Sequence, residues 1–345
     1  MKHYAGLDVS LEETSVCVVD DEGEVVAELK VASEPGSIAT ALEPWQRTLC
    51  RAGLEAGGLT PWLCRGLWDL GLPAVCIETR RMKAYAKASP VKTDRRDARL
   101  IALAMRAGLY RAVHVKSEES HKVRLALTAR QALLRQARQL QGKIRGDLKV
   151  FGIKLGKVGS GGFAGRVKAR LAERPDLLAL VEPLLEIRAE QLTRVRAYDR
   201  LLRRLAQSDP ACRLFVTAPG VGVQTALAYR VVIECPQRFA RSSHVPPALG
   251  LTPRIEESGE RSRRGAITKA GDGLLRALLF EAANALLTRS RRSCPLKRWG
   301  LEIAKRRGTN RARVAVARKL AIILHRMWRD GSAFRWDAEP APTGA

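Results

Sequence analysis

The sequence predicts an α/β domain at the N-terminus, a long helical arm, and a mainly α C-terminal domain. Short β-branched runs alternate with helical patterns over the first 80 residues, which is typical of an α/β domain. Apolar residues then recur at three- and four-residue spacings over two long stretches, which predicts amphipathic helices. Beyond residue 210, turn-forming clusters separate shorter helical patterns. We therefore divide the chain into four segments: 1–115, 116–210, 211–330 and a tail of 331–345.

The first three predicted strands occupy residues 3–9, 14–20 and 24–31. The run Asp20-Asp21-Glu22-Gly23 between the last two favours a tight turn. Because the connections are short, we expect a three-stranded antiparallel meander.

Helices and strands alternate after the meander. The patterns predict a helix near 37–49, a short strand ending at Leu54-Glu55, a helix over 60–70 and a strand over 73–79. A further helix is expected to begin at Thr93-Asp94, where either side chain can cap the free backbone amides.

The apolar spacing in the middle of the chain predicts two long helices. The first covers 121–151, and a Gly-rich interruption at 156–165 separates it from a second that starts at about Pro183 and ends at Ser208-Asp209-Pro210. Narrow apolar stripes with basic residues between them indicate a coiled-coil arm. The arm would either pair subunits or support nucleic acid, and the pattern favours neither role.

The C-terminal segment begins with a helical start and the turn Ala218-Pro219-Gly220-Val221-Gly222. A turn of this composition before a helix is typical of a helix-hairpin-helix element, in which Gly220 and Gly222 let backbone amides approach a phosphate. A plain loop is the alternative. Loops are expected around 236–265, followed by helices near 272–288 and 311–328.

Charge is distributed unevenly along the chain. The formal net charge is +26, from 61 Lys and Arg against 35 Asp and Glu. Residues 1–90 hold 9 basic and 13 acidic residues, whereas 91–210 hold 27 and 12 and 211–330 hold 24 and 8. An acidic head before a basic body suits a protein that gathers carboxylates around cations and neutralises phosphates elsewhere. Nucleic acid is the expected partner.

The seven cysteines form no CxxC pair, so the pattern favours neither a zinc site nor a disulfide framework. No apolar run reaches the roughly 18 to 20 residues of a membrane span, and the N-terminus has no signal-peptide pattern. We expect a cytoplasmic protein without a membrane partner.

Four acids stand where predicted elements begin or end. Asp8 and Glu55 close predicted strands, while Asp94 and Asp97 lie three apart at a helix start and therefore on one face. Taken singly, each is more simply a turn, surface or capping residue. As a cluster they would repel one another unless cations were bound, and hard oxygen ligands favour Mg²⁺, with two ions per site.

Ser258 lies in a predicted polar loop rich in arginine, where a hydroxyl would meet a field that attracts phosphate. From the residues alone, an ordinary loop serine is the better interpretation. Basic side chains are also candidate nucleic-acid contacts, solvated cations being the alternative: Lys92, Arg95, Arg96, Arg254, Arg261, Arg263, Arg264, Lys269 and Arg276.

Several motifs resemble the DEDD transposases of bacterial insertion sequences. In the N-terminal third these are GLDVS at 6–10, GLEAGG at 53–58 and KTDRRDA at 92–98. Further motifs follow in the same order: APGVGVQTA at 218–226, ALGLTPR at 248–254, SGE at 258–260 and RGAITKAGDGLLR at 264–276. The resemblance spans about residues 3–329. It implies an RNase H-like, RuvC-like N-terminal domain in which Asp8, Glu55, Asp94 and Asp97 are the metal-binding tetrad.

The resemblance also implies that Ser258 is a nucleophile that forms a covalent phosphoserine link to DNA. Many relatives have a second serine and a second glycine there, whereas this chain reads Glu256-Glu257-Ser258-Gly259-Glu260. The family further implies recombination of donor and target DNA guided by a structured RNA from the element itself. A homo-oligomer, dimeric or tetrameric, with active sites shared between subunits is expected.

Two other functions remain open at this point. A junction-resolving endonuclease would use the carboxylates with water as the nucleophile and leave Ser258 as a bystander. A catalytically silent nucleic-acid-binding protein would keep the charge without turnover, although the presence of all four acids argues against it.

Overall fold

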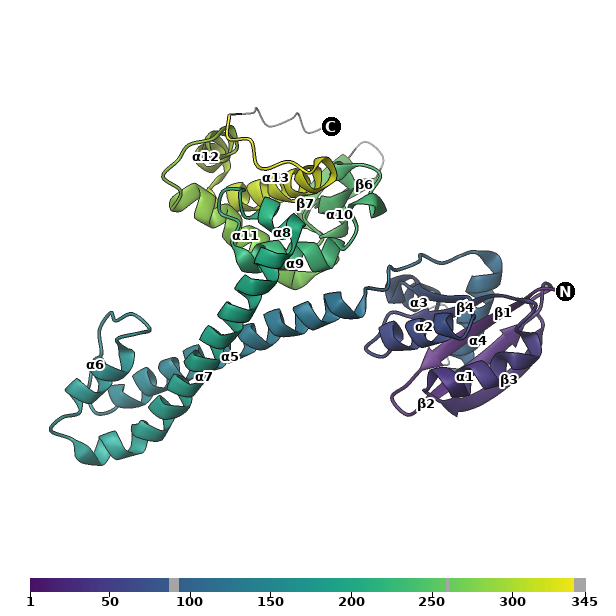
Figure 1. Ribbon diagram of the computed structural model, residues 1–345, viewed down its shortest axis with the longest axis horizontal. Coiled ribbons are helices and arrows are strands. Elements are labelled where there is room, and N and C mark those ends of the chain that lie inside the picture. The colour runs from purple at the N-terminus through teal and green to yellow at the C-terminus, as the bar shows by residue number, and fades with distance from the viewer. Residues whose placement is uncertain (87–92, 259–260, 338–345) are drawn as a thin grey trace. The chain divides into compact units, whose positions relative to one another are not determined.

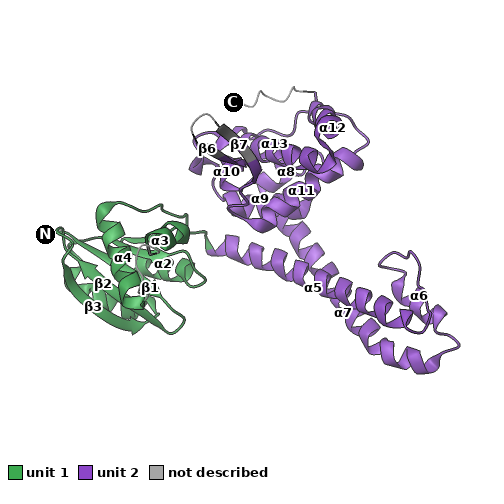
Figure 2. Ribbon diagram, turned by 180° about the vertical axis from the view of Figure 1, so that it is seen from behind, with its two compact units in different colours: residues 1–117 green, residues 118–345 purple. Residues whose placement is uncertain are grey.

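The computed structural model of the protein describes residues 1–86, 93–258 and 261–337. The chain forms two compact units, residues 1–117 and 118–345 (Figure 2). Each unit has its own buried apolar clusters. Among the described residues, no helix is both long enough and apolar enough to cross a membrane.

The first unit is an α/β domain built on one five-stranded sheet. Its elements in chain order are β1 (His3–Val9), β2 (Glu13–Val19), β3 (Val25–Ala32), α1 (Pro35–Leu42), the 3-10 helix η1 (Glu43–Trp45), β4 (Leu49–Glu55), α2 (Thr60–Asp69), β5 (Ala74–Ile77), α3 (Thr79–Ala86) and α4 (Asp94–Ala107).

The strand order is β3-β2-β1-β4-β5. Antiparallel pairing joins β1 to β2 and β2 to β3, which confirms the predicted meander. Its predicted tight turn is also present, because Asp20 Oδ1 accepts hydrogen bonds from the backbone amides of Glu22, Gly23 and Glu24 at 3.0, 2.8 and 2.9 Å. β4 and β5 then run parallel to β1, which makes the sheet mixed.

Helices cover both faces of the sheet (Figure 1). Ile38 and Leu42 of α1 and Leu63 and Leu67 of α2 are buried in one cluster with strand residues. On the opposite face, α4 packs through its own buried stripe. The helix expected near 37–49 is shorter than predicted: it ends at Leu42, and the chain enters β4 at Leu49, whose side chain belongs to the sheet core.

The second unit is mainly helical. Its elements are α5 (Glu118–Lys149), α6 (Phe163–Arg170), α7 (Pro175–Ser208), α8 (Pro210–Phe215), α9 (Val223–Ile233), η2 (Pro236–Arg238), η3 (Ser242–His244), α10 (Val245–Ala248), β6 (Pro253–Ser258), β7 (Arg261–Ile267), α11 (Gly273–Thr288), α12 (Pro295–Arg307) and α13 (Thr309–Asp330).

The long helices α5 and α7 pack side by side and antiparallel within this unit (Figures 1 and 2). At one end Ile144 and Val181 share a cluster with α6, and at the other Leu127 and Leu202 join the core of the C-terminal helices. The arm is therefore rooted in the same core as the helices that follow it.

The second arm helix begins eight residues earlier than predicted, at Pro175 instead of Pro183. Pro183 lies inside α7 on an exposed face, where water can solvate the carbonyl that loses its helical hydrogen bond. Leu177 and Val181, both buried in the distal cluster of the arm, extend the helix in front of this proline.

The loops expected around 236–265 contain structure that the sequence did not predict. β6 and β7 form an antiparallel hairpin in which Glu256 stands opposite Arg263 and Ile255 opposite Arg264. Ser258 is therefore the last residue of a strand and not a loop residue.

Candidate functional site

Asp8 and Glu55 lie on neighbouring strands at the carboxyl ends of those strands. β1 and β4 pair in parallel with Leu7 opposite Leu54, so the two acids that follow are adjacent across the sheet. Both side chains are partly buried. The strand ends predicted from the sequence therefore converge.

Asp8 and Glu55 lie on the face of the sheet that packs against α4, where two glycines allow a close approach. A Cβ atom on Gly6 would lie 2.0 Å from the backbone oxygen of Ala98, and one on Gly53 would lie 2.8 Å from Ile101 Cγ2. Both contacts are with α4, so these glycines let the helix approach the sheet closely. Because side chains alternate along a strand, the residue two positions after each glycine projects to this same face. Those residues are Asp8 and Glu55.

The N-terminus of α4 supplies the other two acids. Thr93 caps the helix, since its hydroxyl accepts a hydrogen bond from the Arg96 amide at 3.3 Å, which confirms one of the two predicted caps. Asp97 is partly buried and Asp94 is exposed.

The pKa of Glu55 is raised by burial and by nearby carboxylates. Burial raises the pKa of this carboxyl above its ordinary value, and the charges of Asp8 and, less strongly, Asp97 raise it further. A hydrogen bond from Thr79 and the charge of Lys83 act in the opposite direction. The Glu55 carboxylate is thus repelled by two other carboxylates, those of Asp8 and Asp97.

Asp94 faces a different neighbour. Its charge acts on Lys30 of β3, whose pKa is raised first by a hydrogen bond and charge pairing with Glu13 and further by Asp94. Two of the other three predicted acids, Asp8 and Asp97, therefore act on Glu55, whereas the charge of Asp94 acts on Lys30.

Within residues 1–86, 93–258 and 261–337, no three His, Cys, Asp or Glu side chains are arranged so that they could hold a metal ion as they stand. The donor set nevertheless suits a divalent cation, because carboxylate oxygens are hard ligands and a cation would relieve the repulsion that raises the pKa of Glu55. The residues present fit Mg²⁺ by chemistry.

The residues that hold Glu55 in place were not predicted from the sequence. Thr60 donates its hydroxyl to the Glu55 carbonyl at 2.5 Å, and Thr79 donates to the Ala56 carbonyl at 3.2 Å. Thr79 and Lys83 belong to α3, a short helix after β5; Thr79 was predicted as the end of the strand over 73–79, and no element was predicted for the rest of α3. A threonine followed by a run of good helix formers at 80–86 is the signal that indicates it.

Ser258 stands opposite Arg261 in the hairpin of the second unit. Arg254 and Arg263 are exposed on the same hairpin. Gly259 lies outside the described residues. Arg254 and Arg263 are therefore the two predicted cations of this hairpin whose exposure the structure describes.

The remaining predicted cations differ in their surroundings. Lys92 lies outside the described residues. Arg95 forms an ion pair and a hydrogen bond with Glu28, whereas Arg96 is exposed. Lys269 is exposed and has a φ of 55°, a backbone conformation that side chains other than glycine rarely adopt.

Arg276 is engaged by the protein itself. Its Nη1 donates to the carbonyls of Leu249 at 3.1 Å and Ala270 at 3.4 Å, and the side chain is partly buried. These contacts give it a structural role that the sequence did not indicate.

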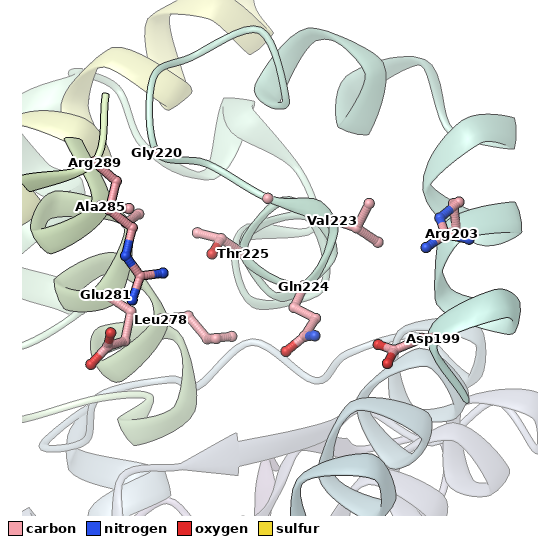
Figure 3. A pocket seen from close by; sticks show the side chains of 12 residues that line it. Asp199, Arg203, Gly220, Val223, Gln224, Thr225, Leu278, Glu281, Ala285 and Arg289 are labelled. Carbon is pink, nitrogen blue, oxygen red and sulfur yellow. The ribbon is translucent and has the colours of Figure 1, made fainter. Parts of the chain in front are cut away.

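The turn before α9 opens a pocket of about 490 Å³ between α7, α9 and α11 (Figure 3). Gly220 has a φ of 80° and lies so close to α11 that a Cβ atom would be 2.2 Å from the Ala282 carbonyl oxygen. Gly222 is the N-cap of α9 and has open space beside it. Arg203 and Arg289 line opposite sides of the pocket around the first turn of α9.

Two family models match the chain. One, described as a transposase, matches residues 5–152, which include the carboxylates, and the other, described as the transposase IS116/IS110/IS902 family, matches residues 212–297, which include the hairpin.

Curated relatives extend the match over nearly the whole chain. The transposase for insertion sequence element IS1111A of Coxiella burnetii is 30% identical over 327 residues, which cover 92% of this chain and 87% of the relative. The transposase for insertion sequence element IS1328 of Yersinia enterocolitica is 25% identical over 83% of this chain and 85% of its own length.

Among solved structures, RuvC of T. thermophilus in complex with a Holliday junction substrate is similar, with 15% identity and a TM-score of 0.26. The similarity covers 33% of this chain and 100% of RuvC.

Proposed function

The chain belongs to the IS116/IS110/IS902 family of transposases, and from this premise we propose that it cuts and rejoins the strands of an insertion sequence with two chemical centres. One centre is the carboxylate set Asp8, Glu55, Asp94 and Asp97. The other is the hydroxyl of Ser258.

The observation that carries the proposal is the group around Glu55. Two glycines bring α4 against the sheet, and the result is a Glu55 carboxylate that two other carboxylates repel. Repulsion between carboxylates opposes folding, so their proximity indicates a functional site, either for a bound cation or for a carboxyl that exchanges a proton with a substrate. The five-stranded sheet with order β3-β2-β1-β4-β5 is consistent with the RNase H-like domain that the resemblance implies.

We assign Mg²⁺ to this centre, two ions per site. Asp8, Glu55, Asp94 and Asp97 would hold the ions, and the charges of Asp8 and Asp97 already act on Glu55. When bound, the ions would stabilise charge on the oxygens of a reacting phosphodiester. The protein residues themselves hold Glu55 in place: Thr60 donates its hydroxyl to the Glu55 carbonyl, and Thr79 lies close enough to the Glu55 carboxyl to lower its pKa.

Ser258 supplies the nucleophile in this proposal. Its Oγ forms a bond to phosphorus, one P–O bond of the DNA backbone breaks, the hydroxyl proton passes to solvent and the released DNA oxygen takes up a proton from solvent. The phosphoserine ester conserves the energy of the phosphodiester, so a second DNA hydroxyl can displace the serine and rejoin the strand.

Exposed cations would bind the backbone of the nucleic acid. Arg254, Arg263 and Lys269 lie on or beside the hairpin, and Arg96 is next to the carboxylates. The first turn of α9 at Gly222 would offer backbone amides to a phosphate, as in a helix-hairpin-helix element.

We also assign a structured guide RNA to the protein. Residues 91–210 carry 27 basic and 12 acidic residues with few aromatic side chains, which suits recognition of backbone and A-form shape more than base stacking. Purified protein that carries no RNA from its own element would remove this part of the proposal.

The carboxylate centre is tested by Asp97→Asn. We expect strand cleavage in Mg²⁺ to be lost, by about 10²-fold or more, while nucleic-acid binding persists, because the change removes one ligand charge and leaves the basic surfaces intact. Asp69→Asn, an exposed acid at the end of α2, is the matched control and should cleave normally. Full cleavage by Asp97→Asn would contradict the proposed centre.

A further inference from the structure

The base of the β6–β7 hairpin is a crossing of two loops, one before β6 and one after β7. Gly250 has a φ of 66°, and a Cβ atom there would lie 2.1 Å from the Ala270 carbonyl oxygen. Gly271 has a φ of 85°, and its Cβ atom would lie 2.1 Å from the Ala248 carbonyl oxygen. The two loops therefore touch backbone to backbone, and only glycine permits this contact.

Backbone hydrogen bonds continue the ladder of the hairpin into this crossing. The Thr268 amide donates to the Thr252 carbonyl at 2.9 Å, and the Lys269 amide donates to the Gly250 carbonyl at 3.2 Å. Lys269 adopts its left-handed conformation at this point, which is unfavourable for a residue with a side chain and persists only where surrounding contacts enforce it. The crossing is thus a tightly specified joint.

One arginine bridges the two loops. Arg276 lies in the first turn of α11 and donates Nη1 to Leu249 in one loop and to Ala270 in the other. The helix itself is anchored, because Asp272 caps it through the Leu275 amide at 2.8 Å and forms an ion pair with Arg124 of α5. Arg276 therefore ties the joint to a fixed helix.

We propose that Arg276 is a positioning residue that sets the direction of the β6–β7 hairpin and so places Ser258 for attack. This inference rests on the proposed function, because the position of Ser258 affects the reaction only if Ser258 is the nucleophile. It assigns Arg276 to the hairpin joint and not to a phosphate of the DNA.

Because the hairpin is long, a small tilt at the joint produces a large displacement of Ser258. At about 3.3 Å per residue, the five steps from Pro253 to Ser258 span about 17 Å, so a tilt of about 5° at the joint would move Ser258 by about 1.5 Å. A displacement near 1 Å can reduce a reaction by about 10²-fold. A contact far from the serine can therefore control its reactivity.

The experiment compares Arg276→Ala with a matched arginine. Arg238 also donates Nη1 to two backbone carbonyls, those of Ile233 at 2.7 Å and Val232 at 3.4 Å, and neither carbonyl belongs to the two loops of the joint. Four variants of the full-length protein are assayed below their melting temperatures: Arg276→Ala, Arg238→Ala, Arg276→Lys and Ser258→Ala. The measurements are DNA affinity with its salt dependence, the rate of covalent adduct formation, and amide hydrogen exchange at Thr268 and Lys269.

We expect Arg276→Ala to slow adduct formation by about 10²-fold and to speed exchange of the two joint amides, with DNA affinity unchanged. Arg276→Lys, which keeps a donor and the charge, should recover part of the rate. Arg238→Ala should form the adduct at the normal rate. If Arg276→Ala does not fold, the partial loss in Arg276→Lys with faster joint exchange is the deciding result.

Three results would overturn the inference. Adduct formation at the normal rate in Arg276→Ala would do so, as would weaker DNA binding with a shallower salt dependence, which indicates a phosphate contact instead. Equal loss in Arg238→Ala would mean a general stability effect. Normal adduct formation by Ser258→Ala would instead refute the proposed function, so the two failures are distinguishable.

Discussion

Glu55 is stabilised in its protonated form by the fold. Burial and the charge of Asp8 raise its pKa, so folding of the metal-free protein favours the neutral acid. The stability that this protonation contributes is fully present below the ordinary carboxyl pKa of about 4.3 and is lost as the pH rises through the folded-state pKa. At neutral pH the charged form of Glu55 therefore opposes folding.

Glu55→Gln should accordingly raise the melting temperature of the metal-free protein at pH 7 and leave it nearly unchanged near pH 4. Glutamine keeps a hydrogen-bond acceptor for Thr79 and removes the repelling charge. Mg²⁺ should stabilise the native protein and fail to stabilise the variant. Thermal melts at both pH values check this, with the exposed Glu43→Gln as control. A lower melting temperature at pH 7 without metal would contradict the assignment.

At the scale of residues, the sequence located the acids better than the groups around them. Asp8 and Glu55 could be placed because strand ends are visible in the pattern and parallel strands align their ends. Thr60 and Thr79 could not be found, because their hydrogen bonds depend on a close approach that no spacing encodes. Arg276 was predicted to contact phosphate, and only the fold reveals its two carbonyl partners.

At the scale of elements, the approach of α4 to the sheet determines the carboxylate centre. Gly6 lies beneath the Ala98 carbonyl, and even one added methyl group would meet backbone there. The backbone of α4 must shift to admit it, and Asp97 moves with the helix.

Gly6→Ala is therefore expected to lower the free energy of unfolding of the first unit by about 1–3 kcal/mol and to reduce Mg²⁺-dependent cleavage. Denaturant titration and a cleavage assay at a temperature where the variant is folded measure the two effects. Gly36→Ala is the control, because nothing lies within 4 Å of a Cβ at that position of α1. Unchanged stability and cleavage in Gly6→Ala would show that α4 does not set the site.

Elements with a clear hydrophobic periodicity were predicted from the sequence, and elements stabilised by specific contacts were not. The long helices α5 and α13 have clear apolar stripes, and their predicted ranges agree with the structure within a few residues. The hairpin β6–β7 has charged residues on facing positions, and α3 is short and polar, so neither shows a clear hydrophobic period. Helix α7 passes through Pro183 because its apolar contacts lie on both sides of that residue.

At the scale of the whole molecule, the two chemical centres belong to different units. The carboxylates lie in residues 1–117 and Ser258 in residues 118–345. We propose that an assembly of at least two copies shares its active sites, so that one chain supplies carboxylates to the serine of another.

Mixing two inactive variants tests this sharing. Asp97→Asn and Ser258→Ala should each be inactive alone and regain activity together, because mixed assemblies contain a site with intact carboxylates and an intact serine. With random mixing into dimers, half the assemblies are mixed and each has one functional site of two, so recovery should reach about a quarter of the normal rate if sites act independently. Confirmed mixed oligomers without any recovery would refute site sharing.

The most direct test of the account is the fate of the DNA phosphate at Ser258. Full-length protein is incubated with element-end DNA and Mg²⁺, denatured, and analysed for a covalent protein–DNA adduct, and the modified residue is mapped by mass spectrometry. We expect an adduct on Ser258 that is retained in Ser262→Ala, on the same hairpin, and lost together with strand rejoining in Ser258→Ala. Cleavage by Ser258→Ala at the normal rate, with no adduct in the native protein, would contradict the account and favour a junction-resolving endonuclease that uses water.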